Sequence, residues 1–269
     1  MTYKEMIIKL FRENVKGKCA DSSSANQKHD GKDGHWLERQ FGIKANADNK
    51  ADLWGYELKN QTTSKTTFGD WSANEYIYTS DQYKNLFKGN NKKERQDSFL
   101  QIFGQANTEK GGRHSWSGTP CPKIDGYNTF GQKLQIVDNK AIVVVYSFSK
   151  DARKNKNEIV PQEFRKEGLI LARWFGETSP STKRVDTCLK LKLEKKFNDK
   201  GWFTCKKDEN GKYNEICFGE PINFNSWIKL VANGTVYFDS GMYEGNSRPY
   251  SMWRANNTFW DSLITERYN

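Results

Sequence analysis

Two apolar stretches on either side of Asp138-Asn139 give the strongest strand signal in the sequence and restrict the choice of fold. Residues 133–137 and 140–148 are rich in valine and isoleucine, which favour β-strands. The Asp-Asn pair between them is typical of a tight turn. This pattern predicts an antiparallel hairpin, so any fold assigned to the chain must contain a sheet that includes it.

Helical periodicity marks three other segments. In residues 2–16 apolar side chains recur every three or four positions, which predicts an amphipathic helix. Residues 34–41 and 222–231 also suit helices, whereas residues 19–34 and 111–126 are rich in loop-forming residues. The combination predicts an α/β fold of the mixed α+β kind, with a mixed β-sheet flanked by helices.

The remaining segments carry weaker signals. Residues 51–59 and 235–238 are expected to be extended, and residues 188–203 are interpreted as an extended segment with a lysine-rich loop. Residues 60–70 form a polar Thr/Ser/Lys stretch, and residues 149–158 are charged and expected to be solvated. No internal repeat or long linker interrupts the chain, so we expect one compact domain over residues 1–269, with up to two lobes.

The charge balance indicates the class of partner. Lysine and arginine together number 43 against 33 acidic residues, giving a formal net charge of +10 and a pI near 9.2. Such a surplus favours polyanions, and nucleic acid is the first candidate. The longest apolar run, residues 141–146, is too short to cross a bilayer, so we expect a soluble intracellular protein. The five cysteines lack paired spacing and are expected to be reduced thiols.

Three charged side chains between residues 52 and 59 carry the chemical signal. On a strand, Glu57 and Lys59 point to the same face, while Tyr56 and Leu58 point to the other and can anchor the strand. If the glycine before Tyr56 allows a bend, Asp52 can return beside Glu57. Two neighbouring carboxylates form a hard oxygen site suited to Mg²⁺.

Phosphodiester hydrolysis requires this combination of groups. Mg²⁺ held by Asp52 and Glu57 would neutralise developing charge and polarise a water molecule. Lys59 would position the attacking water, or act as its base if its pKa is lowered. The number of metal ions stays open. His29, His35 and His114 are not spaced as metal ligands, which disfavours a histidine-metal nuclease.

The run Gly34-His35-Trp36-Leu37-Glu38-Arg39-Gln40-Phe41-Gly42-Ile43, followed by Asp52 and the Glu57-Leu58-Lys59 strand, resembles the type II restriction endonucleases of the BcnI and MvaI family. The resemblance is close over residues 34–60 and looser beyond. That family belongs to the MutH-like branch of the PD-(D/E)xK nucleases, which implies a restriction-endonuclease core, bilobed around a DNA cleft.

The resemblance also implies further properties. A helix glutamate ahead of the metal-binding pair supports the site in that family, and it maps onto Glu38. Catalytic elements are expected mainly within residues 1–150 and DNA-recognition elements mainly within 151–269. The implied setting is the prokaryotic cytoplasm, with double-stranded DNA as substrate, a cognate DNA methyltransferase as genetic partner, and no membrane. Monomer and homodimer both remain compatible.

Side chains able to read bases gather near the C-terminus. Arginine and asparagine make the commonest specific contacts to guanine and adenine edges. The densest set of candidate DNA contacts comprises Asn246, Ser247, Arg248, Tyr250, Arg254 and Asn256. We expect this segment to read a short site that contains G·C pairs. Arg113 and His114 follow two glycines and form a second candidate, since glycines allow close approach to phosphate.

Two alternatives stay open at this level. A MutH-like repair endonuclease that nicks DNA would use the same residues under the control of partner proteins. A sequence-specific DNA-binding protein that does not cleave would keep the acidic residues for structure only. The family's C-terminal segment differs from residues 241–250, so the recognition sequence, the position of the cut and the methylation sensitivity cannot be carried over.

Overall fold

The computed structural model describes residues 1–21, 32–44, 48–178 and 188–269. Residues 22–31 of the predicted loop 19–34 lie outside the described part. The chain divides into two compact units. Unit 1 comprises Met1–Thr66, Lys192–Phe224 and Ala255–Asn269, and unit 2 comprises Thr67–Leu191 and Asn225–Arg254.

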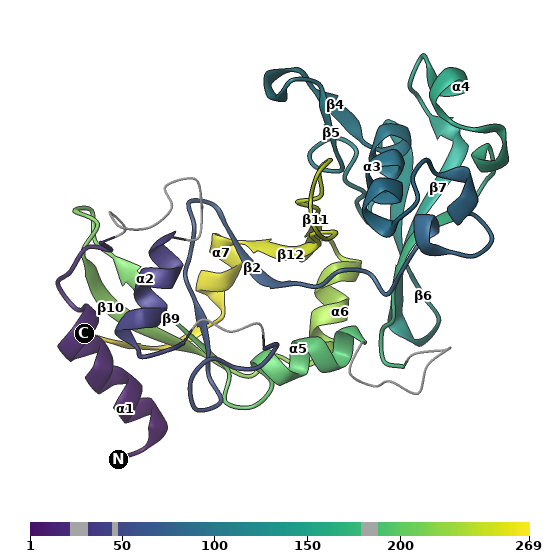
Figure 1. The fold of residues 1–269 in the computed structure, drawn as a ribbon. Helices are drawn as coiled ribbons and strands as arrows, with labels where there is room; N and C mark the ends of the chain where they lie inside the picture. Colours follow the sequence, from purple (N-terminus) through teal and green to yellow (C-terminus); the bar gives the residue numbers. More distant parts are fainter. Residues whose placement is uncertain (22–31, 45–47, 179–187) are drawn as a thin grey trace. The chain divides into compact units, whose positions relative to one another are not determined.

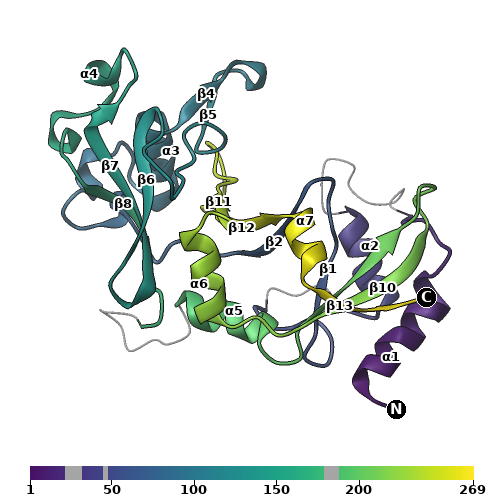
Figure 2. The ribbon, with the colours of Figure 1, turned by 180° about the vertical axis from the view of Figure 1, so that it is seen from behind.

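Unit 1 is built on a four-stranded mixed sheet. Its strands, in spatial order, are β1 (Glu57–Lys59), β9 (Trp202–Lys207), β10 (Tyr213–Gly219) and β13 (Ile264–Tyr268). β1 runs parallel to β9, and the other neighbours are antiparallel. Figure 2 shows β10 and β13 side by side, with the C-terminus beside α1. A short parallel strand at the edge of this sheet therefore carries the predicted catalytic pair.

Two N-terminal helices cover one face of this sheet. α1 (Tyr3–Leu10) begins with a capping box between Thr2 and Glu5 and continues as a π-helical segment, Phe11–Val15. α2 (Lys32–Gln40) packs its apolar side chains into the same core, where Tyr56 and Leu58 are also buried. Both predicted N-terminal helices are confirmed (Figure 1).

The prediction for residues 188–203 is wrong. This stretch forms the helix α5 (Leu189–Phe197) followed by the start of β9. Leu189, Leu193 and Phe197 recur every four residues and are buried, which is the spacing of one helical face. A short helix, α7 (Asn257–Ser262), places Trp260 against Phe197, with ring centroids 6.1 Å apart.

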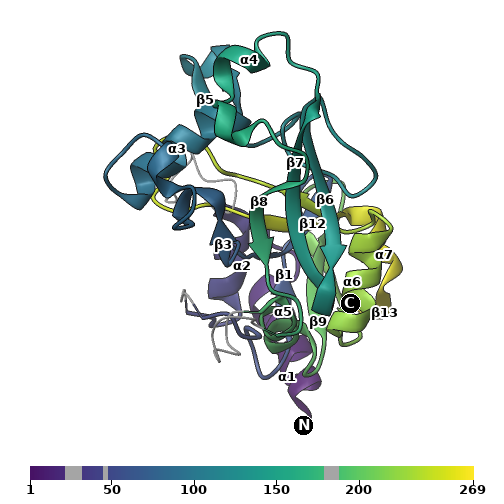
Figure 3. The same ribbon diagram turned by 90° about the vertical axis from the view of Figure 1, so that its right-hand side faces the viewer.

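Unit 2 contains an antiparallel sheet. Its order is β3 (Glu75–Tyr76), β8 (Leu169–Trp174), β7 (Ala141–Asp151) and β6 (Phe130–Val137). β6 and β7 form the predicted hairpin, with a 3-10 turn at Asp138–Lys140. Figure 3 shows α3 (Lys92–Phe103) beside the long strands. The ring of Phe103 packs against the ring of Tyr146 of β7, with the two ring centroids 5.1 Å apart. The helix and the sheet therefore share one core.

A second sheet, which lies mostly in unit 2, packs against a cluster of tryptophans. Its strands are β11 (Tyr237–Asp239), β12 (Met252–Asn256) and β2 (Lys65–Asp70). Trp227 of α6 (Phe224–Ala232) contacts the rings of Phe68, Trp71 and Trp253. The helix expected at 222–231 is confirmed. The stretch 60–70 was described from the sequence only as polar, but it contains β2. Thr66 and Phe68 are two residues apart and both are buried, as side chains on one face of a strand are.

Shorter elements complete unit 2. The hairpin of β4 (Gln105–Asn107) and β5 (Arg113–Ser115) lies where a loop was expected from residue 111. The elements not yet named are the helix α4 (Lys156–Ile159) and the 3-10 turns Ile77–Thr79, Lys84–Leu86, Thr108–Lys110 and Gln162–Phe164. Asp151 is buried, so the expectation that residues 149–158 are solvated is wrong there. Arg153 neutralises it at 2.7 Å.

All five cysteines are free thiols, as expected from their spacing. In the part of the chain that the structure describes, no helix has the length and apolar character needed to span a bilayer.

Candidate active site

A tight turn in front of β1 brings Asp52 back beside Glu57. Leu53 and Tyr56 exchange two backbone hydrogen bonds of 3.0 and 2.9 Å. The two residues between them, Trp54 and Gly55, have φ values of 50° and 90°, as in type I′ turns. Glycine suits the second position, where a Cβ would lie 2.1 Å from the Asp199 carboxylate.

The Asp52 carboxylate is held against β1. Its Oδ2 accepts a hydrogen bond of 2.9 Å from the backbone N–H of Leu58. Burial, followed by the negative charge of Glu57, raises the pKa of Asp52 to about 6, although Lys196 and Lys59 act in the opposite direction. The two carboxylates therefore repel each other in the folded protein, as expected of a pair that shares one electrostatic environment.

Two lysines meet one oxygen of Glu57. The Nζ atoms of Lys59 and Lys196 lie 2.8 and 2.7 Å from Glu57 Oε1. The other oxygen, Oε2, is buried and has no hydrogen-bond partner among the described residues. Leaving a buried charged oxygen unsatisfied costs on the order of 1–3 kcal/mol or more. A cation bound at Oε2 would remove that cost.

Lys59 occupies a dry environment. It is 9% exposed, and its Nζ lies 5.0 Å from the centroid of the Phe197 ring. Burial lowers the pKa of the Lys59 ammonium and Lys196 adds to that effect, whereas Glu57 opposes it. A lysine with a lowered pKa releases its proton more easily, which fits a group that exchanges protons with water.

The Glu38 side chain is paired with His35 of the same helix. Glu38 lies on α2, with its side chain 34% exposed, and its carboxylate is 3.1 Å from His35 Nδ1. Its neighbours on α2, Trp36 and Leu37, are buried in the core that also holds Leu58. The supporting role of Glu38 stays a prediction from the resemblance.

Lys196 is the residue of this cluster that sequence reasoning missed. It sits on α5, far along the chain from Lys59, in a segment that was expected to be extended. Its signal was the spacing of Leu193 and Phe197, which places both on a helical face beside Lys196. The carbonyl of Lys195, on the same helix, also accepts a 3.1 Å hydrogen bond from Ala51 N and so holds the segment before Asp52.

The two arginines of the C-terminal candidate segment are both paired with carboxylates. Arg248 is 2.6 Å from Asp70 and stacks over Tyr250, with its guanidinium carbon 4.1 Å from the ring centroid. Arg254 Nε lies 3.3 Å from the Asp239 carboxylate. These ion pairs belong to unit 2 and compete with any contact to DNA.

The other members of that segment differ in exposure. Asn246 is only 5% exposed, and its side chain accepts a 2.7 Å hydrogen bond from Tyr243 N within a local turn. Ser247 is exposed, and Asn256 is an exposed residue of unit 1 at the start of α7. Their contacts with DNA stay predictions.

The second candidate, Arg113 and His114, lies next to the first in unit 2. Ser115 of β5 forms an isolated antiparallel β-bridge with Tyr243. The backbone N–H of Glu244 donates a 3.0 Å hydrogen bond to the His114 carbonyl. The structure thus brings together two segments that lie more than a hundred residues apart in the sequence.

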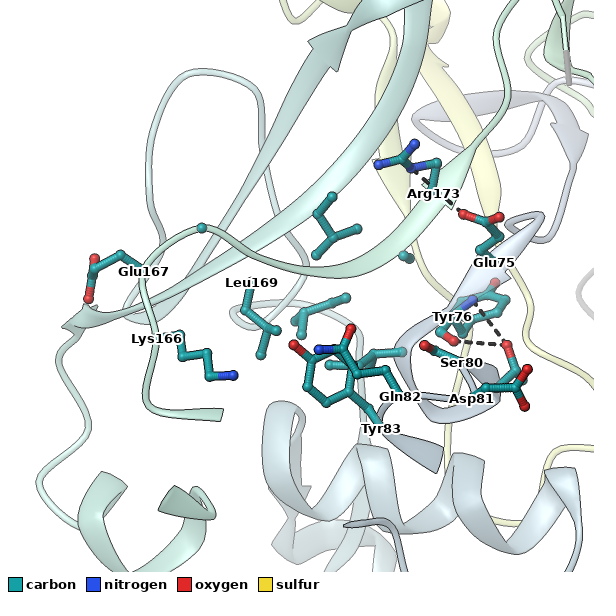
Figure 4. Close-up of a pocket in the computed structure, with 16 residues that line it drawn as sticks. Glu75, Tyr76, Ser80, Asp81, Gln82, Tyr83, Lys166, Glu167, Leu169 and Arg173 are labelled. Carbon is teal, nitrogen blue, oxygen red and sulfur yellow. Dashed lines mark hydrogen bonds and ion pairs between the residues drawn. The ribbon is translucent and has the colours of Figure 1, made fainter. Parts of the chain in front are cut away.

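A cavity of about 630 Å³ in unit 2 is lined by none of these predicted residues. It is lined by β3, the residues that follow it as far as Tyr83, residues 166–168 and β8 (Figure 4). Tyr83 and Lys166 face the same space, while Arg173 pairs with Glu75 at its edge. Among the described residues, no group of three or more acidic, histidine or cysteine side chains could hold a metal ion.

Comparison with known proteins decides the family. The family model of the LlaMI restriction endonuclease matches residues 15–268. The chain belongs to the LlaMI restriction endonuclease family. It is 57% identical over 264 residues to the type II restriction enzyme ScrFI of Lactococcus lactis subsp. cremoris, which covers 98% of this chain and 97% of ScrFI.

A solved structure confirms the fold of this LlaMI-family member. The MvaI restriction endonuclease in complex with its cognate DNA substrate matches with a TM-score of 0.60 at 14% identity, covering 100% of this chain and 98% of that one. The predictions of a mixed α/β restriction-endonuclease fold and of a type II restriction endonuclease are confirmed. Enzymes of this type act on double-stranded DNA and generally use Mg²⁺.

Proposed function

We propose that this restriction endonuclease hydrolyses phosphodiester bonds at a short specific sequence of duplex DNA with Mg²⁺ at Asp52 and Glu57. The observation that carries the proposal is that Asp52, from the turn before β1, and Lys196, from α5, meet Glu57 and Lys59 of the edge strand β1, with Glu57 Oε2 buried and unpartnered among the described residues. The whole chain would act as one endonuclease domain in the prokaryotic cytoplasm.

The residues present fit a magnesium ion. Mg²⁺ is usually bound by one or two carboxylates, with water and substrate phosphate completing its coordination. Asp52 and Glu57 supply such a pair, and burial together with the charge of Glu57 raises the pKa of Asp52, an environment in which a bound cation would favour the ionised carboxylate. When bound, Mg²⁺ would neutralise charge on the scissile phosphate and activate water.

Each residue of the cluster has a separate task. Lys59 Nζ would hold the attacking water and accept its proton when the amine is neutral, which its lowered pKa favours. Lys196 keeps Glu57 Oε1 occupied, so that Oε2 is left for the cation. Phe197 excludes water beside Lys59, which strengthens these electrostatic contacts. Glu38 would support the site from α2.

DNA recognition is assigned to unit 2 and to the start of α7. The proposed contacts are Arg113, His114, Asn246, Ser247, Arg248, Tyr250, Arg254 and Asn256. The β4–β5 hairpin lies against the segment from residue 242 to 246, which supports grouping Arg113 and His114 with Asn246. The other contacts are proposed from the donor and acceptor groups of their side chains. A cognate DNA methyltransferase would protect the host genome.

Digestion of unmethylated phage DNA tests the proposal. We expect discrete fragments with Mg²⁺, no fragments with EDTA, and none from the Glu57→Ala variant with Mg²⁺, because this variant lacks the carboxylate that receives the cation. Sequencing the fragment ends identifies the site. DNA binding without any cut or nick in Mg²⁺ would contradict an endonuclease and favour a DNA-binding protein that does not cleave.

The affinity of the metal-free enzyme for Mg²⁺ is expected to depend on pH. Asp52, with a pKa of about 6, must lose its proton before it can bind the cation. Affinity should therefore fall by up to about tenfold for each pH unit below 6. Isothermal titration calorimetry between pH 7.5 and pH 5 measures this, with Mn²⁺ as a second ion. Equal affinity across that range would remove Asp52 from the ligand set.

A further inference from the structure

We propose that Arg113 reads a guanine in the major groove, and that Tyr243 and Glu244 are the positioning residues that hold it there. The inference rests on the proposed function, because it requires an enzyme that binds a specific duplex sequence. It is carried by contacts between the β4–β5 hairpin and the segment 242–246, all within unit 2. It also ranks Arg113 above Arg248 and Arg254 as a reader of bases.

Hydrogen bonds clamp the hairpin to this segment. The N–H of Trp116 donates to the Met242 carbonyl at 2.8 Å, and the N–H of Glu244 donates to the His114 carbonyl at 3.0 Å. Trp116 is fully buried, so the base of the hairpin is anchored in the core. The position of Arg113 is thereby set by rigid structure rather than by a free loop.

The Glu244 carboxylate strengthens the clamp. One oxygen accepts a 2.5 Å hydrogen bond from His114 N and lies 3.2 Å from His114 Nδ1, and the other accepts a 2.9 Å bond from Gln101 of α3. The hairpin and α3 are thus joined through one carboxylate. Charge-assisted hydrogen bonds of this kind are stronger than neutral ones.

Arg113 is oriented by an aromatic ring and has no internal acceptor. Its guanidinium carbon lies 3.7 Å from the centroid of the Tyr243 ring. No residue that the structure describes accepts a hydrogen bond from its guanidinium. Its Nε is buried, whereas Arg113 as a whole is half-buried. Stacking fixes the plane of the guanidinium, and its two terminal Nη groups have no acceptor among the described residues. Two parallel N–H donors in a fixed plane are what a bidentate contact with guanine O6 and N7 needs.

The other two candidate arginines lack this freedom. Arg248 donates to Asp70 and Arg254 lies against Asp239. Reading a guanine with either side chain would first require an ion pair to break. A ranking based on the density of arginine and asparagine in the sequence favoured their segment, but the contacts favour Arg113.

The shape of the hairpin suits a DNA groove. Residues 105–112 are all exposed, and the glycines at the turn, Gly111 and Gly112, have φ values of 65° and 80° with open space around them. Figure 1 shows the β4–β5 hairpin extending away from α3. A two-stranded β-ribbon fits into the major groove of B-DNA, so the tip and Arg113 can approach base edges together.

The test compares sequence preference in wild type and variants. Once the wild-type site is known from the fragment ends, binding in Ca²⁺ is measured for that site and for sites with one base pair changed. In Arg113→Ala, the preference for the cognate base pair over the changed one should fall by roughly five- to 150-fold at one G·C pair. The salt dependence of the affinity should stay unchanged. Glu109→Gln, on the same exposed turn, is the matched control and should keep the wild-type preference.

Substitutions of Tyr243 test whether its ring positions Arg113. Tyr243→Phe keeps the ring and should retain the preference, whereas Tyr243→Leu should lose it at the same G·C pair as Arg113→Ala. A uniform loss of affinity over all sequences, with the salt slope reduced by about one, would instead identify Arg113 as a phosphate contact and overturn the proposal.

Unchanged preference in Arg113→Ala beside a site-specific wild-type enzyme would also overturn it. Wild-type protein that neither binds nor cuts any site in preference to others would overturn the proposed function together with this inference. The two failures are therefore distinguishable.

Discussion

Cleavage by the Asp52→Asn variant is expected to fall by at least about a thousandfold, while binding to the cognate site persists. A lost metal ligand removes several kcal/mol of transition-state stabilisation, and each 1.36 kcal/mol corresponds to a factor of ten in rate. The asparagine oxygen can still accept the hydrogen bond from Leu58 N, so the turn should be preserved. Single-turnover cleavage in Mg²⁺ and binding in Ca²⁺ measure the two quantities.

The melting temperature of metal-free Asp52→Asn shows whether the variant has lost only a metal ligand or has also lost its folded structure. The folded state raises the pKa of Asp52 from 3.8 to about 6, so the ionised carboxylate destabilises the metal-free fold above pH 6. That penalty disappears as the pH falls towards 4. Metal-free Asp52→Asn should therefore melt at a higher temperature than wild type at pH 7 and not at pH 4.

Asp199→Asn is the matched control for Asp52→Asn. Asp199 lies against the same turn, beside Gly55, but has no part in the proposed site, and its variant should cut at the wild-type rate. Cleavage retained by Asp52→Asn, or lost equally by Asp199→Asn, would contradict the assignment of Asp52.

Asp151→Ala is expected to destabilise unit 2 by about 3–5 kcal/mol, the usual cost of removing one partner from a buried ion pair. The Asp151 side chain is fully buried, and its carboxylate accepts hydrogen bonds from Arg153 and from the Tyr146 hydroxyl, at 2.7 and 2.9 Å. Its loss leaves a guanidinium that is only 11% exposed without its counter-charge. Urea denaturation measures the free energy of unfolding.

An acidic residue at the surface of the same unit serves as the control. Asp81 pairs with Lys84, three residues further along the chain, and its side chain is 95% exposed, so Asp81→Ala should produce no measurable change. Equal effects of the two substitutions would show that Asp151 and Arg153 do not form a stabilising pair. Burial opposes the ionisation of Asp151, but the hydrogen bonds from Arg153 outweigh it and lower its pKa, so this stabilisation should weaken at acid pH.

Elements with a single unambiguous period could be predicted from the sequence. The opening helix and the β6–β7 hairpin are examples, because their apolar spacing fits one regular structure only. The α5 segment was misassigned because leucine and lysine alternate at its start, while the period of four becomes visible only with Phe197. Strand β2 was missed because Thr66 is polar although buried.

In the candidate site, residues close together in the sequence could be predicted to meet, whereas residues far apart in the sequence could not. Asp52, Glu57 and Lys59 lie within eight residues, so strand alternation and one glycine are sufficient to predict that they meet. Lys196 is one of many basic residues in the chain, and nothing along the sequence connects it to Glu57. The pairing of Arg113 with Tyr243 was equally hidden, since it depends on a bridge between distant segments.

The turn at Leu53–Tyr56 has a consequence for how the acidic motif tolerates change. In a two-residue hairpin, the residues that flank the turn face each other in pairs, so Asp52 and Glu57 are opposite neighbours on one side of this hairpin. The number of residues between them, four, therefore determines that both acids lie on the same side. One inserted or deleted residue would send one acid to the opposite side, whereas Trp54 can be exchanged for asparagine or glycine, which tolerate positive φ.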